Sequence, residues 1–169
     1  TAGMLTSSGQ AANFFALFNL ANCGDHIVSS STIYGGTFNL MDVTMRRMGV
    51  DVTFLSPDCT EEELNAAFRP NTKAVFGETI ANPALTVLDI EKFARVAHAN
   101  GVPLIVDAAQ SAGSIPLDLE QLGAAFIAMP GHKGLQGPQG TGLLLCGMTP
   151  EPLLMGGRFY FGNNFHPWG

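Results

Sequence analysis

The segment of residues 131–142 is the part of this sequence whose residue types point most directly to chemistry. It holds five glycines in twelve residues, and glycine lets a backbone approach a bulky ligand closely. Lys133 lies among these glycines and is the only lysine or arginine between Val96 and Gly157. No serine or threonine follows it, so the segment does not fit a phosphate-binding P-loop. An isolated amine in such a loop favours a nucleophilic or Schiff-base lysine, with a solvated surface lysine as the alternative.

Two earlier segments could carry complementary groups. Asp107 follows the apolar residues 103–106, at the position where open α/β sheets bind ligands. A carboxylate buried there needs a cationic or hydrogen-bonding partner, whereas a turn or helix-capping aspartate is the alternative. Residues 6–12 are small or polar and lead into a helix, whose first backbone N–H groups suit a phosphate. An ordinary helix cap gives the same pattern, so neither segment alone identifies a site.

The elements that must position these groups alternate between helix-like and strand-like patterns. Strands are expected over residues 26–30, 50–55, 73–76, 103–106, 125–129 and 143–146, and helices over residues 11–22, 37–48, 60–68, 90–100 and about 119–122. Ser7 or Ser8 is the expected cap of the first helix, Thr60 with Glu63 forms a capping box, and Asp89 is the expected cap of the helix over residues 90–100. Apolar strands separated by helices predict an α/β fold, with a mostly parallel sheet covered by helices on both faces.

Composition limits the partners. The chain has 169 residues, a net charge of −6 and only 13% charged residues. The acidic balance argues against nucleic acid. The low charge predicts surface that is covered either by a partner subunit or by other parts of a larger protein, and a homo-oligomer is expected. No apolar run is long enough for a membrane span and no signal peptide opens the chain, so we expect no membrane partner and a cytoplasmic location. The three cysteines and the histidines lack disulfide or metal-ligand spacing, so no metal is expected.

Taken together, the segments resemble the fold-type I pyridoxal 5'-phosphate (PLP) enzymes, in two branches. Residues 6–106 resemble O-acetylhomoserine sulfhydrylases of the Cys/Met metabolism family, through residues 8–12, 24–26, 34–37 and 78–83. Residues 107–156 resemble class V aminotransferases of the cysteine-desulfurase type, through residues 107–113 and 130–142. The change near residues 101–107 indicates a chimera or a fragment. The resemblance implies an incomplete PLP-transferase large domain over residues 1–157, followed by an unassigned tail over residues 158–169.

The resemblance implies the two ends of a cofactor site. Lys133 would form the internal aldimine with the cofactor aldehyde, and Asp107 would pair with the pyridinium nitrogen on the opposite side of the ring. Gly9 and Gln10, beside Ser8, would donate backbone N–H groups to the phosphate. Because an imine forms from an unprotonated amine, we expect Lys133 to be buried in the glycine-lined cleft, where burial favours the neutral form.

The resemblance also implies contacts along the ring. Tyr34 matches the tyrosine that stacks on the ring and moves protons in the sulfhydrylase branch. Asn82 matches that branch's contact to the ring hydroxyl, and Gln110 matches the equivalent contact in the class V branch. His132 matches a class V residue near the phosphate.

Departures from both branches bear on activity. Residues 130–132 stand where the sulfhydrylase branch has serine and threonine phosphate contacts. The arginine that holds the substrate carboxylate has no clear counterpart, and Arg158 is the only late candidate. No cysteine is placed as a desulfurase nucleophile.

The leading functional prediction is therefore a PLP enzyme of sulfur amino-acid metabolism, in cysteine and methionine biosynthesis, that acts on a small amino-acid substrate by γ-replacement. Desulfurase or class V aminotransferase chemistry is the first alternative. A cofactor-binding fragment or recombinant without turnover is the second, and turnover is expected to be weak or absent in this chain.

Overall fold

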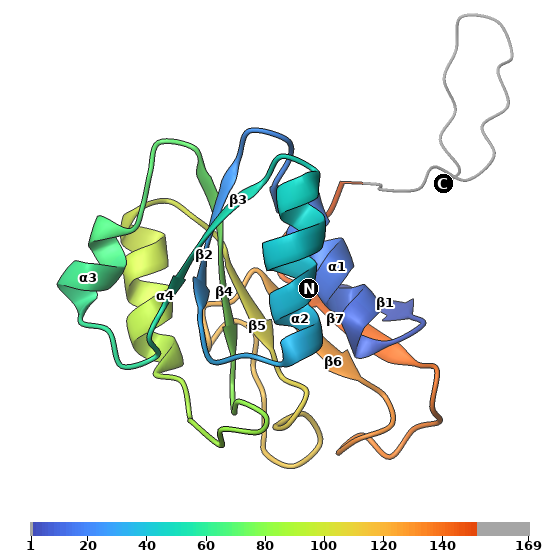
Figure 1. Ribbon diagram of the computed structural model, residues 1–169. Helices are drawn as coiled ribbons and strands as arrows, with labels where there is room; N and C mark the ends of the chain where they lie inside the picture. The colour runs from blue at the N-terminus through green and yellow to red at the C-terminus, as the bar shows by residue number, and fades with distance from the viewer. Residues whose placement is uncertain (1, 152–169) are drawn as a thin grey trace, which may run out of the picture.

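The computed structural model describes residues 2–151, and the tail predicted over residues 158–169 lies outside them (Figure 1). Within this range, seven strands form one sheet in the order β1-β7-β6-β5-β4-β2-β3. The strands are β1 (Ala2–Thr6), β2 (His26–Ser30), β3 (Asp51–Leu55), β4 (Thr72–Glu78), β5 (Leu104–Asp107), β6 (Phe126–Pro130) and β7 (Gly142–Cys146). The helices are α1 (Gly9–Leu20), α2 (Gly35–Asn39), the π-helix η1 (Leu40–Met45), α3 (Glu61–Ala66) and α4 (Ile90–Ala99).

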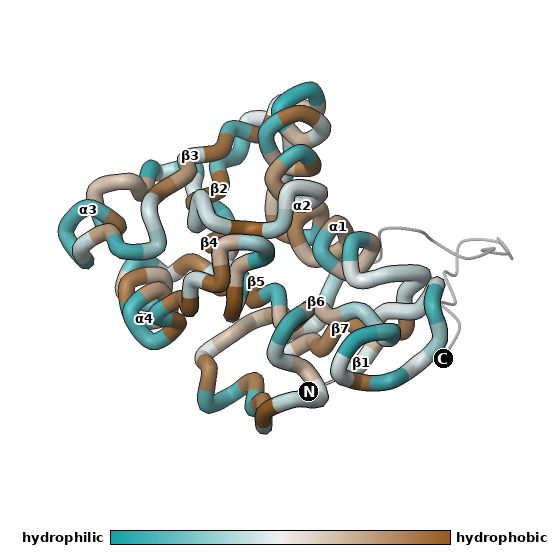
Figure 2. Tube along the Cα trace, turned by 60° about the horizontal axis from the view of Figure 1, so that its bottom comes forward, coloured by the Kyte–Doolittle hydropathy of each residue, from teal (hydrophilic) through white to brown (hydrophobic). Residues whose placement is uncertain are grey.

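Helices cover both faces of the sheet, as the sequence predicts. Side chains alternate along each strand, so Ile105 belongs to the hydrophobic cluster that contains buried residues of α1 and η1, whereas its neighbours Leu104 and Val106 belong to the cluster that contains buried residues of α3 and α4. Figure 1 shows α1 and α2 on one side of the sheet and α3 and α4 on the other. Figure 2 shows hydrophobic colour along much of β4 and β5 and hydrophilic colour on α3. The α/β fold with a mostly parallel sheet is confirmed.

The edge of the sheet beyond β6 departs from the parallel pattern. β7 runs antiparallel to both β6 and β1. The edge strand is therefore β1, which the sequence analysis did not predict. β1 is almost wholly exposed and contains Gly3, so it has no buried face that would create an alternating pattern. Its strand conformation depends on pairing with β7, about 140 residues away along the chain.

Local capping agrees with the sequence at three helices. Ser8 Oγ accepts from the Ala11 N–H at 3.0 Å, and the Thr60–Glu63 capping box is formed in both directions. Asp89 caps α4 through the Lys92 N–H at 2.9 Å. These contacts lie within four residues of one another, which is why the sequence pattern predicts them.

Two helix predictions are corrected. Residues 119–122 form turns rather than a helix. The Asp118 carboxylate caps the first turn through the Glu120 and Gln121 N–H groups, but Gly123 then takes a positive φ of 63°, which ends the segment before a second turn can form. The helix expected from residue 37 begins at Gly35, because the Glu78 carboxylate accepts from the Tyr34 N–H and fixes the preceding residue. It then continues as η1, in which Met41 and Met45 are buried.

Within residues 2–151, none of the helices has the length and apolar character needed to cross a bilayer.

Candidate active site

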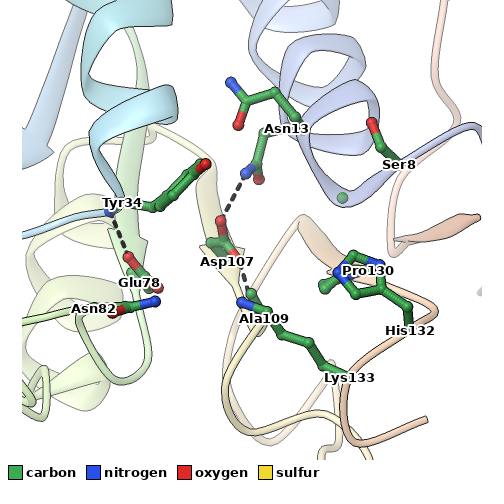
Figure 3. A pocket seen from close by; sticks show the side chains of 12 residues that line it. Ser8, Asn13, Tyr34, Glu78, Asn82, Asp107, Ala109, Pro130, His132 and Lys133 are labelled. Atoms are coloured by element: carbon green, nitrogen blue, oxygen red, sulfur yellow. Dashed lines mark hydrogen bonds between the residues drawn. The ribbon is translucent and has the colours of Figure 1, made fainter. Parts of the chain in front are cut away.

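A cavity of about 360 Å³ opens at the carboxyl ends of β4, β5 and β6. It is also bounded by the first turn of α1 and by the start of α2 (Figure 3). The lining residues are Ser8, Gly9, Gln10, Asn13, Tyr34, Glu78, Asn82, Asp107, Ala109, Pro130, His132 and Lys133. Parallel strands end at the same edge of a sheet, so segments far apart in the sequence meet here.

The first turn of α1 supplies backbone donors to the cavity. Ser8 is the N-cap, and within residues 2–151 the N–H groups of Gly9 and Gln10 have no hydrogen-bond partner. Close packing orients this turn, because a Cβ on Gly9 would lie 2.9 Å from the Pro130 nitrogen. The Gln10 side chain donates to the Gly36 carbonyl at 3.2 Å and accepts from the Thr37 hydroxyl at 3.1 Å, which ties α1 to α2. The turn can therefore receive an anion.

Asp107 ends β5 and is buried on the inner wall of the cavity. Its Oδ2 accepts from Asn13 Nδ2 at 2.6 Å, and its Oδ1 accepts from the Ala109 N–H at 2.9 Å. Burial raises the pKa of this carboxyl, while the two hydrogen bonds and the charge of Lys133 oppose the rise. A cation brought to this wall would therefore be stabilised by a carboxylate in a low-dielectric setting.

Glu78 ends β4 directly beside Asp107 and is a second buried carboxylate that the sequence analysis assigned no role. Its Oε2 accepts from the Tyr34 N–H at 2.7 Å, whereas its buried Oε1 has no partner within residues 2–151. Burial, followed by the charge of Asp107, raises the pKa of Glu78 to about 7. The Tyr34 side chain is half exposed, and Figure 3 shows it facing the cavity.

The titration of Glu78 predicts a pH-dependent stability. With a folded pKa near 7 and an ordinary value of 4.5, the folded chain binds a proton between these values that the unfolded chain has released. Stability contributed by this group is therefore lost as the pH rises from 4.5 to above 7. Glu78→Gln, which does not titrate, should gain up to roughly 3 kcal/mol relative to the wild type across this window. Urea unfolding at pH 5 and pH 8 measures the gain, and equal differences at both pH values would contradict it.

Lys133 reaches the cavity from the loop after β6. The Gly131 N–H donates to the Thr141 carbonyl at 2.9 Å, and the Gly137 N–H donates to the Gly131 carbonyl at 2.7 Å, so the loop is folded back on itself. The Lys133 side chain is exposed, so the expectation of a buried amine is wrong. The neighbouring glycines have no side chains with which to cover it.

Two glycines in contact hold the lysine loop against the turn after β5. Gly113 has a φ of 80°, and a Cβ on it would lie 2.3 Å from the Gly134 carbonyl carbon and oxygen. We expect Gly113→Ala to cost about 3 kcal/mol or more of unfolding free energy, because it combines a clash with backbone strain. Gly140→Ala is the matched control: its φ is 78° but the space around it is open, so about 1 kcal/mol is expected. Chemical denaturation of both variants measures the difference, and equal losses would show that the contact contributes nothing.

Of the remaining predicted site residues, two line the cavity and one does not. Asn82 and His132 line the cavity, whereas Gln110 is not one of its lining residues. The hydrogen bond from the Ala109 N–H to Asp107 turns the chain so that Ala109 forms the wall instead. Sequence reasoning also missed Asn13 and Pro130. Asn13 could have been found as a polar residue in the apolar run one turn after Gly9.

Within residues 2–151, no group of three or more histidine, cysteine, aspartate or glutamate side chains is arranged to hold a metal ion.

Comparison with known proteins places this fold in an enzyme class. An O-acetylhomoserine (thiol)-lyase structure from Campylobacter jejuni superimposes on 85% of this chain, with a TM-score of 0.78 and 32% sequence identity. The match covers 35% of the Campylobacter jejuni chain, and that structure contains N'-pyridoxyl-lysine-5'-monophosphate. The fold is therefore that of the PLP-dependent enzymes.

Sequence comparison gives the family. The model of the family described as Cys/Met metabolism PLP-dependent enzyme matches residues 1–139, and this chain belongs to that family. O-acetyl-L-homoserine sulfhydrylase of Corynebacterium glutamicum is 48% identical over 137 residues, which are 81% of this chain and 31% of that protein. O-acetyl-L-homoserine sulfhydrylase 1 of Thermus thermophilus is 38% identical over 98% of this chain and 38% of its own length. The chain thus spans about a third of the length of these relatives.

Proposed function

We propose that this chain is the cofactor-binding segment of a PLP-dependent enzyme of O-acetylhomoserine sulfhydrylase type. One observation carries the proposal: a single cavity brings together an anion-receiving helix start, a buried carboxylate and a lysine amine. The family and the names of the relatives agree with this chemistry.

The residues of the cavity fit PLP, which carries a phosphate, a basic ring nitrogen and an aldehyde. The N–H groups of Gly9 and Gln10 suit the phosphate, and Asp107 suits a protonated ring nitrogen. The buried Oε1 of Glu78, which has no hydrogen-bond partner within residues 2–151, belongs to a residue that lines the same cavity. Buried polar atoms without partners are rare and mark a place where a ligand could supply the missing hydrogen bond.

Several residues that line the cavity would take part in the chemistry. When bound, PLP supplies an aldehyde that condenses with amines and a ring that withdraws electrons from the attached carbon. Lys133 Nζ would hold the cofactor covalently and, once released, would carry a proton to or from the substrate. Asp107 would keep the ring nitrogen protonated, and the Tyr34 ring would lie beside the cofactor, with Asn82 and His132 at the cavity wall. The substrate would be O-acetylhomoserine, which loses acetate as sulfide adds.

Two alternatives rest on specific observations. A class V or cysteine-desulfurase activity is favoured by residues 107–113 and by the glycine-rich loop, which lacks serine or threonine directly before Lys133. Cofactor binding without turnover is favoured because none of the lining residues is an arginine that could hold a substrate carboxylate. Arg158, the late candidate, lies outside the described residues. We also propose that the change from sulfhydrylase-like to class V-like residues near residues 101–107 marks a chimera or a fragment.

The proposed location is the cytoplasm and the proposed assembly is a homo-oligomer. A cytoplasmic location is supported by three cysteines that form no disulfide among the described residues. A homo-oligomer is supported by exposed apolar side chains in the loops at the carboxyl edge of the sheet, including Leu85, Val87 and Ile115. The PLP-binding unit is proposed to span residues 1–157.

The test compares two reactions after PLP is added to the 169-residue chain. Cofactor binding is followed by its absorbance spectrum, sulfhydrylase activity by sulfide consumption with O-acetylhomoserine, and desulfurase activity by sulfide release from cysteine. We expect cofactor binding together with sulfide consumption that is weak, since substrate positioning supplies much of the rate. Faster sulfide release from cysteine would favour the desulfurase alternative. Cofactor binding without either reaction would favour the binding segment, and no cofactor binding would overturn the proposal.

A further inference from the structure

Asn13 is a buried amide that joins α1 to two other walls of the cavity. The residue is 2% exposed, and its Nδ2 donates to Asp107 Oδ2 at 2.6 Å and to Thr37 Oγ1 at 3.3 Å. Thr37 in turn donates to Gln10 Oε1 at 3.1 Å. A hydrogen-bonded path therefore runs from the first turn of α1 to the carboxylate at the end of β5. Figure 3 shows the Asn13 amide above the Asp107 carboxylate, on the side away from Lys133.

The hydrogen bond from Asn13 sets the state of Asp107. Within residues 2–151, Asn13 is the only side chain that donates to this carboxylate, and the Ala109 N–H occupies its other oxygen. Burial raises the pKa of Asp107, and the Asn13 hydrogen bond opposes that rise because it stabilises the charged form. Glu78 lies directly beside Asp107 at the end of β4, Lys133 after β6 is the cation whose charge acts on Asp107, and His132 lines the same cavity.

Placing an amide at position 13 leaves a buried polar atom without a hydrogen-bond partner among the described residues. The Asn13 Oδ1 is buried and has no partner among the described residues, and the side chain occupies a face of α1 otherwise filled by Ala12, Ala16 and Leu17. An apolar residue would fill that face without an unpaired acceptor. The amide is therefore explained by what its Nδ2 does for Asp107 rather than by packing.

We propose that Asn13 is a positioning residue, which orients the Asp107 carboxylate toward the cavity and holds it in its charged form. The inference rests on the proposed function, because the charge of Asp107 serves there to pair with a cationic ring nitrogen. Asn13 itself needs no contact with the cofactor, and the sequence resemblance assigns it no role.

The first experiment uses the chain without cofactor. The carboxyl carbon of Asp107 is titrated by NMR in the wild type, in Asn13→Leu and in Asn19→Leu. Asn19 is the matched control, because it lies on the same helix but hydrogen-bonds the Glu151 backbone instead of the cavity. We expect the Asp107 midpoint to move to higher pH in Asn13→Leu and to stay in place in Asn19→Leu. An unchanged midpoint in Asn13→Leu overturns the inference.

The second experiment separates orientation of Asp107 from general damage. PLP affinity is measured against pH, beside an analogue in which carbon replaces the ring nitrogen. We expect Asn13→Leu to bind PLP about tenfold more weakly at the acid end, with a smaller loss at high pH, where Asp107 ionises unaided. Affinity for the analogue should not change. An equal loss for both compounds at every pH shows a merely structural role and overturns the inference.

Outcomes for the two proposals are distinguishable. A shifted NMR midpoint in a chain that binds no PLP supports the role of Asn13 and contradicts the proposed function. PLP binding that depends on Asp107 but not on Asn13 supports the proposed function and contradicts the role of Asn13. If Asn13→Leu does not fold, Asn13→Ala removes the amide without adding apolar volume and is measured in the same way.

Discussion

Replacing Lys133 with alanine is expected to abolish covalent attachment of PLP to this chain. After PLP is added and the complex is reduced with borohydride, the wild type should carry the pyridoxyl label on Lys133, and Lys133→Ala should carry essentially none there. The reason is that Lys133 is the only lysine that lines the cavity formed by the described residues. Peptide mapping by mass spectrometry measures the site and extent of labelling.

Two other lysines serve as controls for this result. Lys73 is exposed on β4 and reacts only as a surface amine. Lys92 donates to the Pro57 and Cys59 carbonyls at 3.1 and 2.8 Å, so its amine is engaged. Labelling of Lys73 or Lys92 as readily as Lys133 would mean that reduction reports surface chemistry and that the assignment of the site is wrong. Because Lys133 is exposed, we expect its replacement to change the unfolding free energy by less than about 0.5 kcal/mol.

Asp107→Asn is expected to weaken PLP binding by about 10- to 100-fold while leaving the fold intact. The lost interaction is a charge-assisted hydrogen bond to the ring nitrogen, worth about 1.5–3 kcal/mol. The same change removes a buried carboxylate, whose burial disfavours the charged form, and keeps one oxygen that can accept from Asn13, but it places an amide NH2 group against the Ala109 N–H. These two effects on stability oppose each other, so a large loss of affinity with a small change in stability distinguishes a functional carboxylate from a structural one.

Fluorescence titration with PLP and urea unfolding measure the two effects of Asp107→Asn. Asp118→Asn is a suitable control, since Asp118 is exposed, caps a turn through the Glu120 and Gln121 N–H groups and lies outside the cavity. We expect it to leave PLP affinity unchanged and to lower stability slightly. If both variants lose affinity equally, the effect does not arise from the cavity.

The sequence by itself determined the features that depend on neighbouring residues. The caps at Thr60 and Asp89, and the cap of α1 to within one residue (Ser7 or Ser8), follow from side chains and N–H groups within four residues of one another. Most strand positions follow from short runs of apolar residues. Asp107 and Lys133 were identified because one follows an apolar strand and the other stands alone among glycines. Family resemblance then joined them into one site, and the cavity does bring them together.

Tertiary structure alone decided the features that depend on contacts between distant segments. The pairing of β1 with β7, the contact of Asn13 with Asp107 across 94 residues and the contact of Glu78 with Tyr34 across 44 residues leave no local pattern. The exposure of Lys133 and the exclusion of Gln110 from the cavity also follow from how loops pack rather than from residue type. Hydrogen bonding and burial at these positions are set by whichever segment the fold places opposite, because side-chain interactions act over a few ångströms of space and not over sequence distance.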